Sequence, residues 1–270
     1  MNIGILGANG FVGRSLCLKY LKENNTVFAI YHKNCSLIPK QCVLVNVETA
    51  HKYNFDCFIV TIGGHSSTYD EFLEQYEFLN RIVKECKYKK IIFISSIEVY
   101  GKHKDTITLK SCFNNPNNYG LSKIAQEFLI KSLPNYIIIR PTYLYGSGMN
   151  ENSLLPIWMH KAKRDKEIIV YGDGKRKQDY LHVDDLAELC WLSTISDKNN
   201  LTVLAATGVS VSNYEIATEI CKNIPDSTIK LFGEDTAESS QYDITDTQKT
   251  YNWKPEVVVV NWISDYIGKI

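Results

Sequence analysis

The 270-residue sequence has no long hydrophobic run and no excess charge of either sign. No stretch approaches the roughly 18 to 20 consecutive apolar residues of a membrane-spanning helix, and the first residues lack the basic flank and apolar core of a signal peptide. Basic and acidic residues both number 30, so no general positive field attracts nucleic acid or anionic lipid. We therefore expect a soluble, cytoplasmic protein that binds neither nucleic acid nor membrane.

The eight cysteines include no C-x-x-C pair, and the chain contains no internal repeat or low-complexity linker. Disulfide frameworks and zinc sites have characteristic cysteine spacings, whereas these cysteines are scattered and several lie in apolar runs. With 44% hydrophobic and 22% charged residues, the composition is that of a globular protein with a packed core. We expect reduced, structural thiols and no metal site.

Short apolar runs alternate with amphipathic stretches, which is the pattern of parallel strands joined by crossover helices. Strands are predicted at residues 3–6, 27–31, 43–45, 57–61, 91–95 and 136–140. Helices are predicted at 11–22, 69–87, 119–133, 183–195 and 213–224. The expected fold is α/β, with a doubly wound dinucleotide-binding (Rossmann) domain over 1–140. A smaller substrate lobe over 141–270 is expected to be partly interleaved with it.

A glycine-rich turn, G-A-N-G-F-V-G, follows the first strand and opens the first helix. Glycines at this spacing let the backbone approach a pyrophosphate, whose charge meets the unpaired N–H groups of the helix N-terminus. Placed in a strand, turn and helix unit, the motif predicts dinucleotide binding rather than only a tight turn. The residues expected at the coenzyme here are Gly7, Asn9, Gly10, Phe11, Val12 and Gly13.

The end of the second strand indicates which coenzyme is used. A carboxylate at this position accepts the ribose hydroxyls and repels a 2′-phosphate. Here Tyr31 is followed by His32 and Lys33, with no acid present. These groups suit a 2′-phosphate through charge-assisted hydrogen bonds, so NADP is favoured over NAD, although the same residues also suit a solvated basic loop.

A tyrosine and a lysine four residues apart lie one turn apart on the same face of a helix. Three pairs have this spacing: Tyr100/Lys104, Tyr119/Lys123 and Tyr171/Lys175. Only Tyr119 leads into a long amphipathic stretch, whereas the other two precede turn-like glycine segments. A tyrosine has a pKa of about 10, so we expect Lys123 to stabilise the phenolate and make Tyr119 a proton shuttle. The alternative is an ordinary half-buried aromatic side chain.

The strand over 91–95 ends in two serines, Ser95 and Ser96. Ligand sites of α/β proteins lie at the carboxyl ends of parallel strands. A hydroxyl at this edge, such as that of Ser96, can hydrogen-bond a reacting oxygen.

At these residues the sequence resembles the extended short-chain dehydrogenase/reductases that modify nucleotide sugars, the epimerase/dehydratase group. The resemblance covers almost the whole chain, and its motifs occur in the family's order. They are the glycine turn over 7–13, the serine-rich strand end over 95–101, the helix start over 116–123, the R-P segment over 140–146, and the segments over 171–174, 179–185 and 251–255.

The resemblance implies a catalytic set of Ser96, Tyr119 and Lys123, with Ser96 chosen because it lies four residues before Tyr100 of V-Y-G. Further coenzyme contacts are implied at Asn46 and Val47 beside the adenine, at Thr61, Ile62 and Gly63 beneath the coenzyme, and at Ser95 and Pro141. The implied substrate contacts are Gly64, Ser96, Glu98, Tyr119, Tyr143, Arg176 and Gln178. A nucleotide-sugar substrate and a homodimer are implied by the same resemblance.

The sequence departs from the family pattern at several positions. The dehydratases have an Asp-Glu pair after the hydroxyl, and Ile97 stands here before Glu98. Because isoleucine cannot donate a proton, elimination of water is disfavoured, while Glu98 acts on substrate or is simply polar lining. Two positions that usually hold the substrate's phosphates are Tyr143 and Gln178. The basic run over 175–177 either replaces that charge or is a solvated turn.

Three functions remain open at this stage. The leading one is an NADPH-dependent reductase of a nucleotide-linked 4-keto sugar, such as a 4-keto-6-deoxy hexose or heptose for surface polysaccharide. In it, Tyr119 donates the proton, Ser96 orients the carbonyl and Lys123 holds the ribose. The second is a nucleotide-sugar 4-epimerase that keeps NAD bound. The third is a catalytically silent regulator that senses a dinucleotide.

Overall fold

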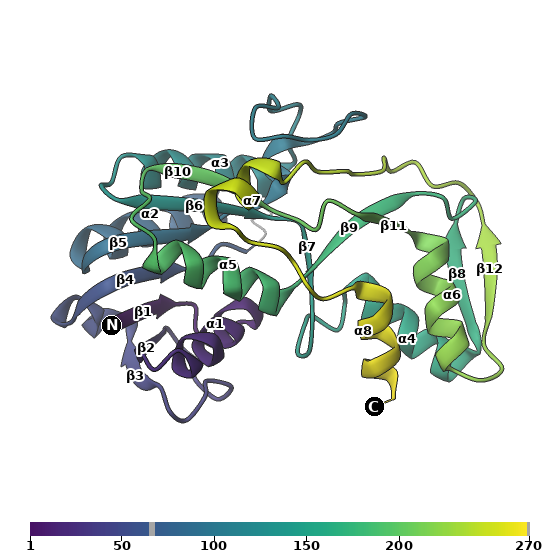
Figure 1. Cartoon of the computed structure of the whole chain (residues 1–270), viewed down its shortest axis with the longest axis horizontal. Coiled ribbons are helices and arrows are strands. Elements are labelled where there is room, and N and C mark those ends of the chain that lie inside the picture. The colour runs from purple at the N-terminus through teal and green to yellow at the C-terminus, as the bar shows by residue number, and fades with distance from the viewer. Residues whose placement is uncertain (65–67, 269–270) are drawn as a thin grey trace.

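The computed structural model describes residues 1–64 and 68–268, and its centre is a seven-stranded parallel sheet (Figure 1). The strand order is β10-β6-β5-β4-β1-β2-β3, and the order reverses beside β1. The strands are β1 (Asn2–Leu6), β2 (Thr26–Tyr31), β3 (Val43–Asn46), β4 (Asn54–Val60), β5 (Lys87–Ile94), β6 (Tyr136–Pro141) and β10 (Leu201–Ala205). Their apolar sequences reflect burial on both faces.

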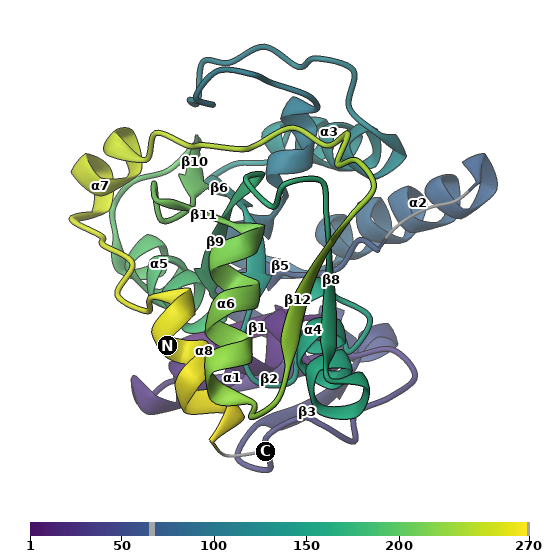
Figure 2. The same ribbon diagram turned by 90° about the vertical axis from the view of Figure 1, so that its right-hand side faces the viewer.

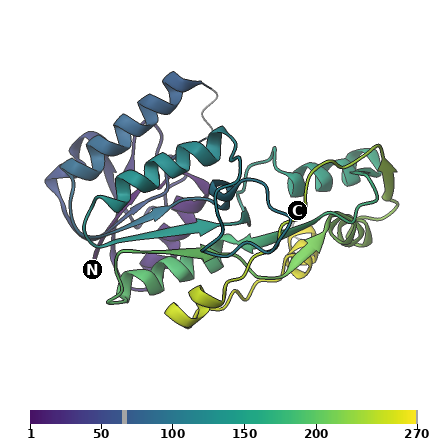
Figure 3. The ribbon, with the colours of Figure 1, turned by 90° about the horizontal axis from the view of Figure 1, so that it is seen from above.

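Helices cover both faces of this sheet (Figure 3). One face carries α1 (Phe11–Lys22), α5 (Val183–Ile195) and α7 (Thr245–Tyr251), and the other carries α2 (Tyr69–Glu85) and α3 (Asn118–Lys131). Each face has its own hydrophobic core. The predicted doubly wound α/β fold is therefore confirmed.

A smaller lobe lies beyond the carboxyl ends of the strands (Figure 2). It contains a three-stranded sheet of β7 (Tyr143–Tyr145), β9 (Lys177–His182) and β11 (Ser210–Ser212), and a pair formed by β8 (Glu167–Tyr171) and β12 (Thr228–Phe232). A third core joins these strands to α4 (Leu154–Asp165), α6 (Asn213–Asn223) and α8 (Val259–Ile267). The chain after Pro141 supplies this lobe and also returns α5, β10 and α7 to the large sheet.

Element bounds differ from the sequence predictions where polar residues or caps intervene. The strand predicted at 57–61 begins earlier, at Asn54, because Asp56 binds the backbone of Asn2 (2.8 Å) and the side chain of Lys89 (2.7 Å) instead of breaking the strand. The helix predicted to reach residue 87 ends at Glu85, because Cys86 has extended backbone and Lys87 already pairs in β5. Within residues 1–64 and 68–268, no helix has the length and apolarity to cross a bilayer, and no three potential metal ligands cluster.

Candidate active site

The glycine turn forms a tight cradle between β1 and α1. Gly7 has φ +89°, and Gly10 stands at the N-cap of α1 without a capping side chain. A Cβ on Gly13 would clash with the carbonyl oxygen of Gly7, and one on Gly7 would meet the Oγ1 of Thr61. The cradle lies beside the point where the strand order reverses. These residues fit a dinucleotide pyrophosphate, because bare backbone and a helix N-terminus face the space where it would bind.

Gly13→Ala tests this cradle. The added methyl group has to displace backbone at Gly7 and Ala8, so we expect a loss of about 1–3 kcal/mol in the free energy of unfolding and loss of coenzyme binding. Denaturant unfolding and titration with NADPH fluorescence measure the two effects. Gly233→Ala is the control, because its φ of +60° makes alanine strained while its Cβ would meet only the ring of Tyr171. Unchanged NADPH affinity in Gly13→Ala would contradict the assignment.

The predicted adenosine contacts meet at the ends of β2 and β3. The Nδ2 of Asn46 lies 3.4 Å from the carbonyl oxygen of His32, and Asn46 also caps the short helix η1 (Val47–Lys52). The nearest acid on this helix, Glu48, is held in a two-pronged contact by Arg81, with both distances 2.9 Å. Hydrogen bonds from Arg81 lower the pKa of Glu48. Its charge is thus already paired, whereas Lys33 has no ion-pair partner in residues 1–64 and 68–268.

Lys123 of α3 is buried near the carboxyl ends of β4 and β5, with 2% of its surface exposed. Its Nζ donates to the carbonyl oxygens of Ile62 and Ile94, each at 3.1 Å. Burial lowers the pKa of Lys123 to about 7, and the charge of Glu127 opposes this effect. Gly63 has φ +116°, and a Cβ there would lie 2.7 Å from this Nζ. The glycine therefore leaves the room that the ammonium group occupies.

Tyr119 lies in the first turn of α3, with its hydroxyl near that of Ser96. Burial raises the pKa of Tyr119, the nearby Ser96 hydroxyl opposes the rise, and the charge of Glu98 adds to it. The Nζ of Lys123 lies 5.7 Å from the centre of the tyrosine ring. The sequence predicts that Lys123 makes this phenol acidic. Instead, burial dominates the shift and Glu98 adds to it, so the hydroxyl is protonated at neutral pH.

The side chains of Asn117 and Ser96 cap two helices and connect the start of α3 to the segment that follows β5. The Oδ1 of Asn117 caps α3 by accepting from the backbone of Gly120 at 2.8 Å, and its Nδ2 donates to Glu98 at 2.7 Å. Ser96 caps the short helix η2 (Ile97–Tyr100) by accepting from the backbone of Glu98 at 3.1 Å. The tyrosine helix and the serine turn are thereby joined directly.

Ser95 belongs to a buried ion-pair network instead of facing the cleft. Its hydroxyl donates to Glu127 at 2.6 Å. Glu127 also binds Arg140 in a two-pronged pair at 2.8 and 2.7 Å, and Arg140 donates to the hydroxyl of Tyr100 at 2.7 Å. The Ser95 hydroxyl thus already gives its hydrogen to Glu127, so the predicted coenzyme contact of Ser95 would use an acceptor lone pair or the backbone. The network joins the end of β5, α3 and β6 behind Lys123.

A cleft of about 550 Å³ opens between the two lobes next to Ser96. Four of the predicted substrate residues line it, namely Ser96, Glu98, Tyr143 and Gln178. Pro141, at the end of β6, immediately precedes Thr142 of the same wall. Gly64 follows β4 and is not part of this lining. The structure thus brings most of the predicted substrate residues together beside the Ser96–Tyr119 pair.

Arg176 lies outside this cleft. Its Nε donates to Asp235 at 2.7 Å, and Lys175 pairs with Asp173 at 2.7 Å. Neither basic residue is among the cleft lining. The charges of Lys175 and Arg176 are thus already matched by acids in the chain.

Sequence reasoning missed one whole wall of the cleft. Residues 236–240 and Tyr242 run across it, opposite Lys102 and His103 of the turn after η2. These polar segments lack the regular spacing of hydrophobic residues from which a helix or strand can be predicted. Their place in the site comes from contacts between residues more than 100 positions apart, such as Ile107 with Gln241 (2.8 Å).

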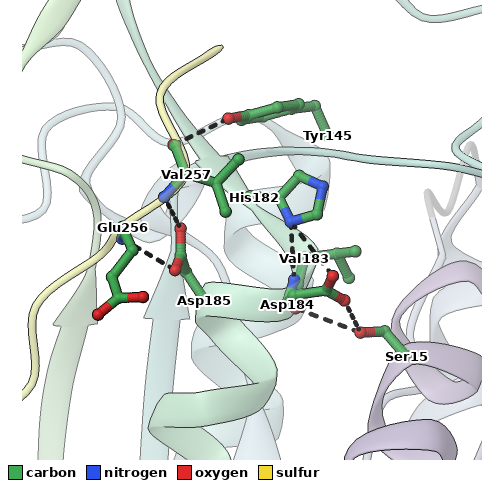
Figure 4. Close-up of polar contacts among 8 residues, drawn as sticks. All are labelled: Ser15, Tyr145, His182, Val183, Asp184, Asp185, Glu256 and Val257. Carbon is green, nitrogen blue, oxygen red and sulfur yellow. Dashed lines mark hydrogen bonds and ion pairs between the residues drawn. The ribbon is translucent and has the colours of Figure 1, made fainter. Parts of the chain in front are cut away.

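The aspartates of the segment over 179–185 have a structural role at the junction of the lobes (Figure 4). Asp185 accepts from the backbone of Glu256 at 3.0 Å and of Val257 at 3.1 Å, and Asp184 accepts from the hydroxyl of Ser15 at 2.8 Å. The two bonds of Asp185 fix the segment after α7, and the bond between Ser15 and Asp184 fixes α1 against α5.

Sequence comparison finds relatives with several activities. The chain is 27% identical over 161 residues to a dTDP-D-glucose 4,6-dehydratase of Dictyostelium discoideum, a match covering 53% of this chain and 37% of that protein. It is 26% identical to a putative UDP-glucose 4-epimerase of Methanocaldococcus jannaschii, with 97% and 98% covered. It is 25% identical to a dTDP-4-dehydro-6-deoxyglucose reductase of Escherichia coli, with 67% and 61% covered.

The fold is shared with solved structures and a known family. The structure of MoeE5 in complex with UDP-glucose and NAD superposes with a TM-score of 0.86 at 17% identity, covering 99% of this chain and 98% of that one. A sequence model of the NAD dependent epimerase/dehydratase family matches residues 3–202. The chain therefore belongs to the NAD-dependent epimerase/dehydratase family, whose members are enzymes of the extended short-chain dehydrogenase/reductase type that act on nucleotide sugars.

Proposed function

We propose that the protein is an NADPH-dependent reductase of a nucleotide-linked 4-keto sugar, such as a 4-keto-6-deoxy hexose or heptose used for surface polysaccharide. The observation that carries the proposal is the closeness of the Tyr119 hydroxyl to Ser96, which lines a cleft of about 550 Å³. Ile97 supports reduction over dehydration, because the next lining residue after Ser96 has no proton to give.

The chain's own residues have separate tasks in this reaction. A nicotinamide coenzyme, when bound in the glycine cradle, supplies the hydride. Ser96 donates a hydrogen bond that holds the carbonyl oxygen of the substrate in place. Tyr119 then gives its hydroxyl proton to that oxygen, and its raised pKa means that the hydroxyl carries this proton before the transfer. Lys123 lies beneath them, where it supports the phenolate that remains.

The preference for NADPH is supported by charges at the adenosine end. The acid closest to this end, Glu48, is paired with Arg81, and Lys33 has no ionic partner in the described part of the chain. A 2′-phosphate placed at His32 and Lys33 meets positive charge without an opposing free carboxylate.

The test is loss of 340 nm absorbance when purified protein is mixed with NADPH or NADH and GDP-, dTDP-, CDP- and UDP-linked 4-keto sugars. We expect turnover with one nucleotide class and a lower KM for NADPH than for NADH. No oxidation of either coenzyme with any of these sugars would overturn the reductase proposal. A lower KM for NADH would overturn only the coenzyme preference.

A nucleotide-sugar 4-epimerase is the second candidate, and the putative UDP-glucose 4-epimerase that aligns over 97% of the chain favours it. The same Ser96, Tyr119 and Lys123 would act in both directions at C4. Such an enzyme keeps its coenzyme between the two half-reactions, so fresh protein should release NAD on denaturation. It should also interconvert sugars without added reductant. A reductase should do neither.

We further propose that the protein forms a homodimer through α2 and α3. Phe128 of α3 is 77% exposed, Leu121 of the same helix is 53% exposed, and Tyr69 at the start of α2 is 72% exposed. Phe128→Glu is expected to convert a dimer to a monomer in light scattering after gel filtration, since burying the new charge at the interface is costly. Val209→Glu, at a 70% exposed position outside these helices, is the control. A monomeric wild type would contradict the proposal.

A further inference from the structure

The substrate cleft is poor in positive charge, although nucleotide sugars carry a diphosphate. At the two positions where the resemblance implies phosphate contacts, this chain has the uncharged Tyr143 and Gln178. Arg176 is occupied by Asp235 and lies outside the lining. Among the described residues that line the cleft, Lys102 is the only lysine or arginine. An anionic substrate that enters here therefore meets one permanent cation, and it lies on the turn after η2.

The backbone of Lys102 is fixed from both sides. Its N–H donates to the carbonyl oxygen of Asn114 at 3.0 Å, and the Nδ2 of Asn114 donates back to the carbonyl oxygen of Lys102 at 2.6 Å. Gly101 has φ +69°, and a Cβ there would clash with the same Asn114 carbonyl. The Lys102 side chain starts from a rigid position, and its Nζ has no ionic partner in residues 1–64 and 68–268.

His103 tightens the same turn. Its Nε2 lies 3.1 Å from the carbonyl oxygen of Tyr100 and 2.9 Å from that of Cys112. Because both partners are acceptors, Nε2 must carry the hydrogen. The imidazole therefore cross-links the two arms of the turn that carries the exposed side chain of Lys102.

We propose that Lys102 is the anion subsite of the cleft and binds an oxyanion of the substrate, either a phosphate of the nucleoside diphosphate or a carboxylate on the sugar. The proposal rests on the proposed nucleotide-sugar function. It moves the charge recognition away from Tyr143 of β7 and Gln178 of β9, where the resemblance places it, to the turn over 100–114.

The test measures dissociation constants by calorimetry for Lys102→Gln, Arg176→Gln and the wild type. Lys104→Gln is the matched control, because Lys104 is exposed on the same turn and is not part of the lining. The ligands are UDP, GDP, dTDP and CDP, followed by the UDP-sugars UDP-glucose and UDP-glucuronate. A lost charge-assisted contact should weaken binding about tenfold or more, with Lys104→Gln unchanged.

The ligand series identifies the oxyanion. Weaker binding of a nucleoside diphosphate to Lys102→Gln assigns the subsite to phosphate, whereas weaker binding of UDP-glucuronate alone assigns it to a sugar carboxylate. The proposal is overturned if Lys102→Gln binds every ligand like the wild type, or if Arg176→Gln alone loses affinity. If the wild type binds none of these nucleotides, the result contradicts the proposed nucleotide-sugar function, and not only the role of Lys102.

Discussion

Tyr119→Phe is expected to lower the rate of 4-keto reduction by about 10²- to 10⁴-fold, the range in which a positioned general acid contributes. The phenyl ring keeps the packing of α3 against Lys123, so only the donor is lost. Loss of the polar contacts of this hydroxyl should cost about 1 kcal/mol of stability, which leaves the protein folded. Stopped-flow or steady-state oxidation of NADPH with the substrate identified above gives the rate.

Tyr171→Phe is the control for this experiment. Tyr171 has the same spacing to Lys175 as Tyr119 has to Lys123, but it ends β8 and is 55% exposed. Its variant should react like the wild type. A Tyr119→Phe variant that keeps more than a tenth of the rate would show that another group protonates the product oxygen.

The parts of the site that the sequence predicted are those fixed by short-range constraints. The glycine turn can be recognised in the sequence because strand, turn and helix follow each other within a few residues. The helix that follows it, α1, has the predicted bounds of 11–22. The choice of Tyr119 over Tyr100 and Tyr171 also follows from local context, since it requires a helix. Tyr100 is instead fully buried under Arg140.

The parts that the sequence did not predict depend on distant packing. Arg140 and Glu127 pair inside the protein because β6 lies beside α3, and only that pairing explains why the hydroxyl of Ser95 is taken. Likewise, Asp235 reaches Arg176 across 59 positions of sequence. Charge counts along the chain cannot show which cations are already matched.

The protonation states of Tyr119 and Lys123 depend on the folded state. The sequence places an ammonium one turn from a phenol, and that spacing alone predicts an acidic tyrosine. In the structure both groups are desolvated, which raises the pKa of Tyr119 and lowers that of Lys123. At neutral pH, Tyr119 is therefore neutral and Lys123 is only partly charged. The stability of the protein should consequently depend on pH.

Lys123→Met is expected to separate stability from catalysis. The pKa of Lys123 falls from 10.5 in an exposed chain to about 7 in the fold, so between these values the unfolded state binds more protons. Wild-type stability therefore rises with pH across this window and changes little from this group below pH 7. Methionine does not titrate, so the variant lacks this gain in stability with pH. Its free energy of unfolding, relative to that of the wild type, should therefore fall by about 3 kcal/mol from pH 7 to pH 9.5.

Urea unfolding of both proteins at the two pH values measures this difference. Lys84→Met, on the exposed side of the last turn of α2, is the control and should differ from wild type by the same amount at both pH values. The two carbonyl oxygens left without a donor in Lys123→Met cost stability at every pH, so the pH dependence is diagnostic and the absolute value is not. Parallel stability curves would mean that the pKa of Lys123 is not lowered in the folded protein. The expected pH-dependent difference, together with loss of reductase activity in the variant, would show that the fold keeps this lysine at a cost in stability because the reaction needs it.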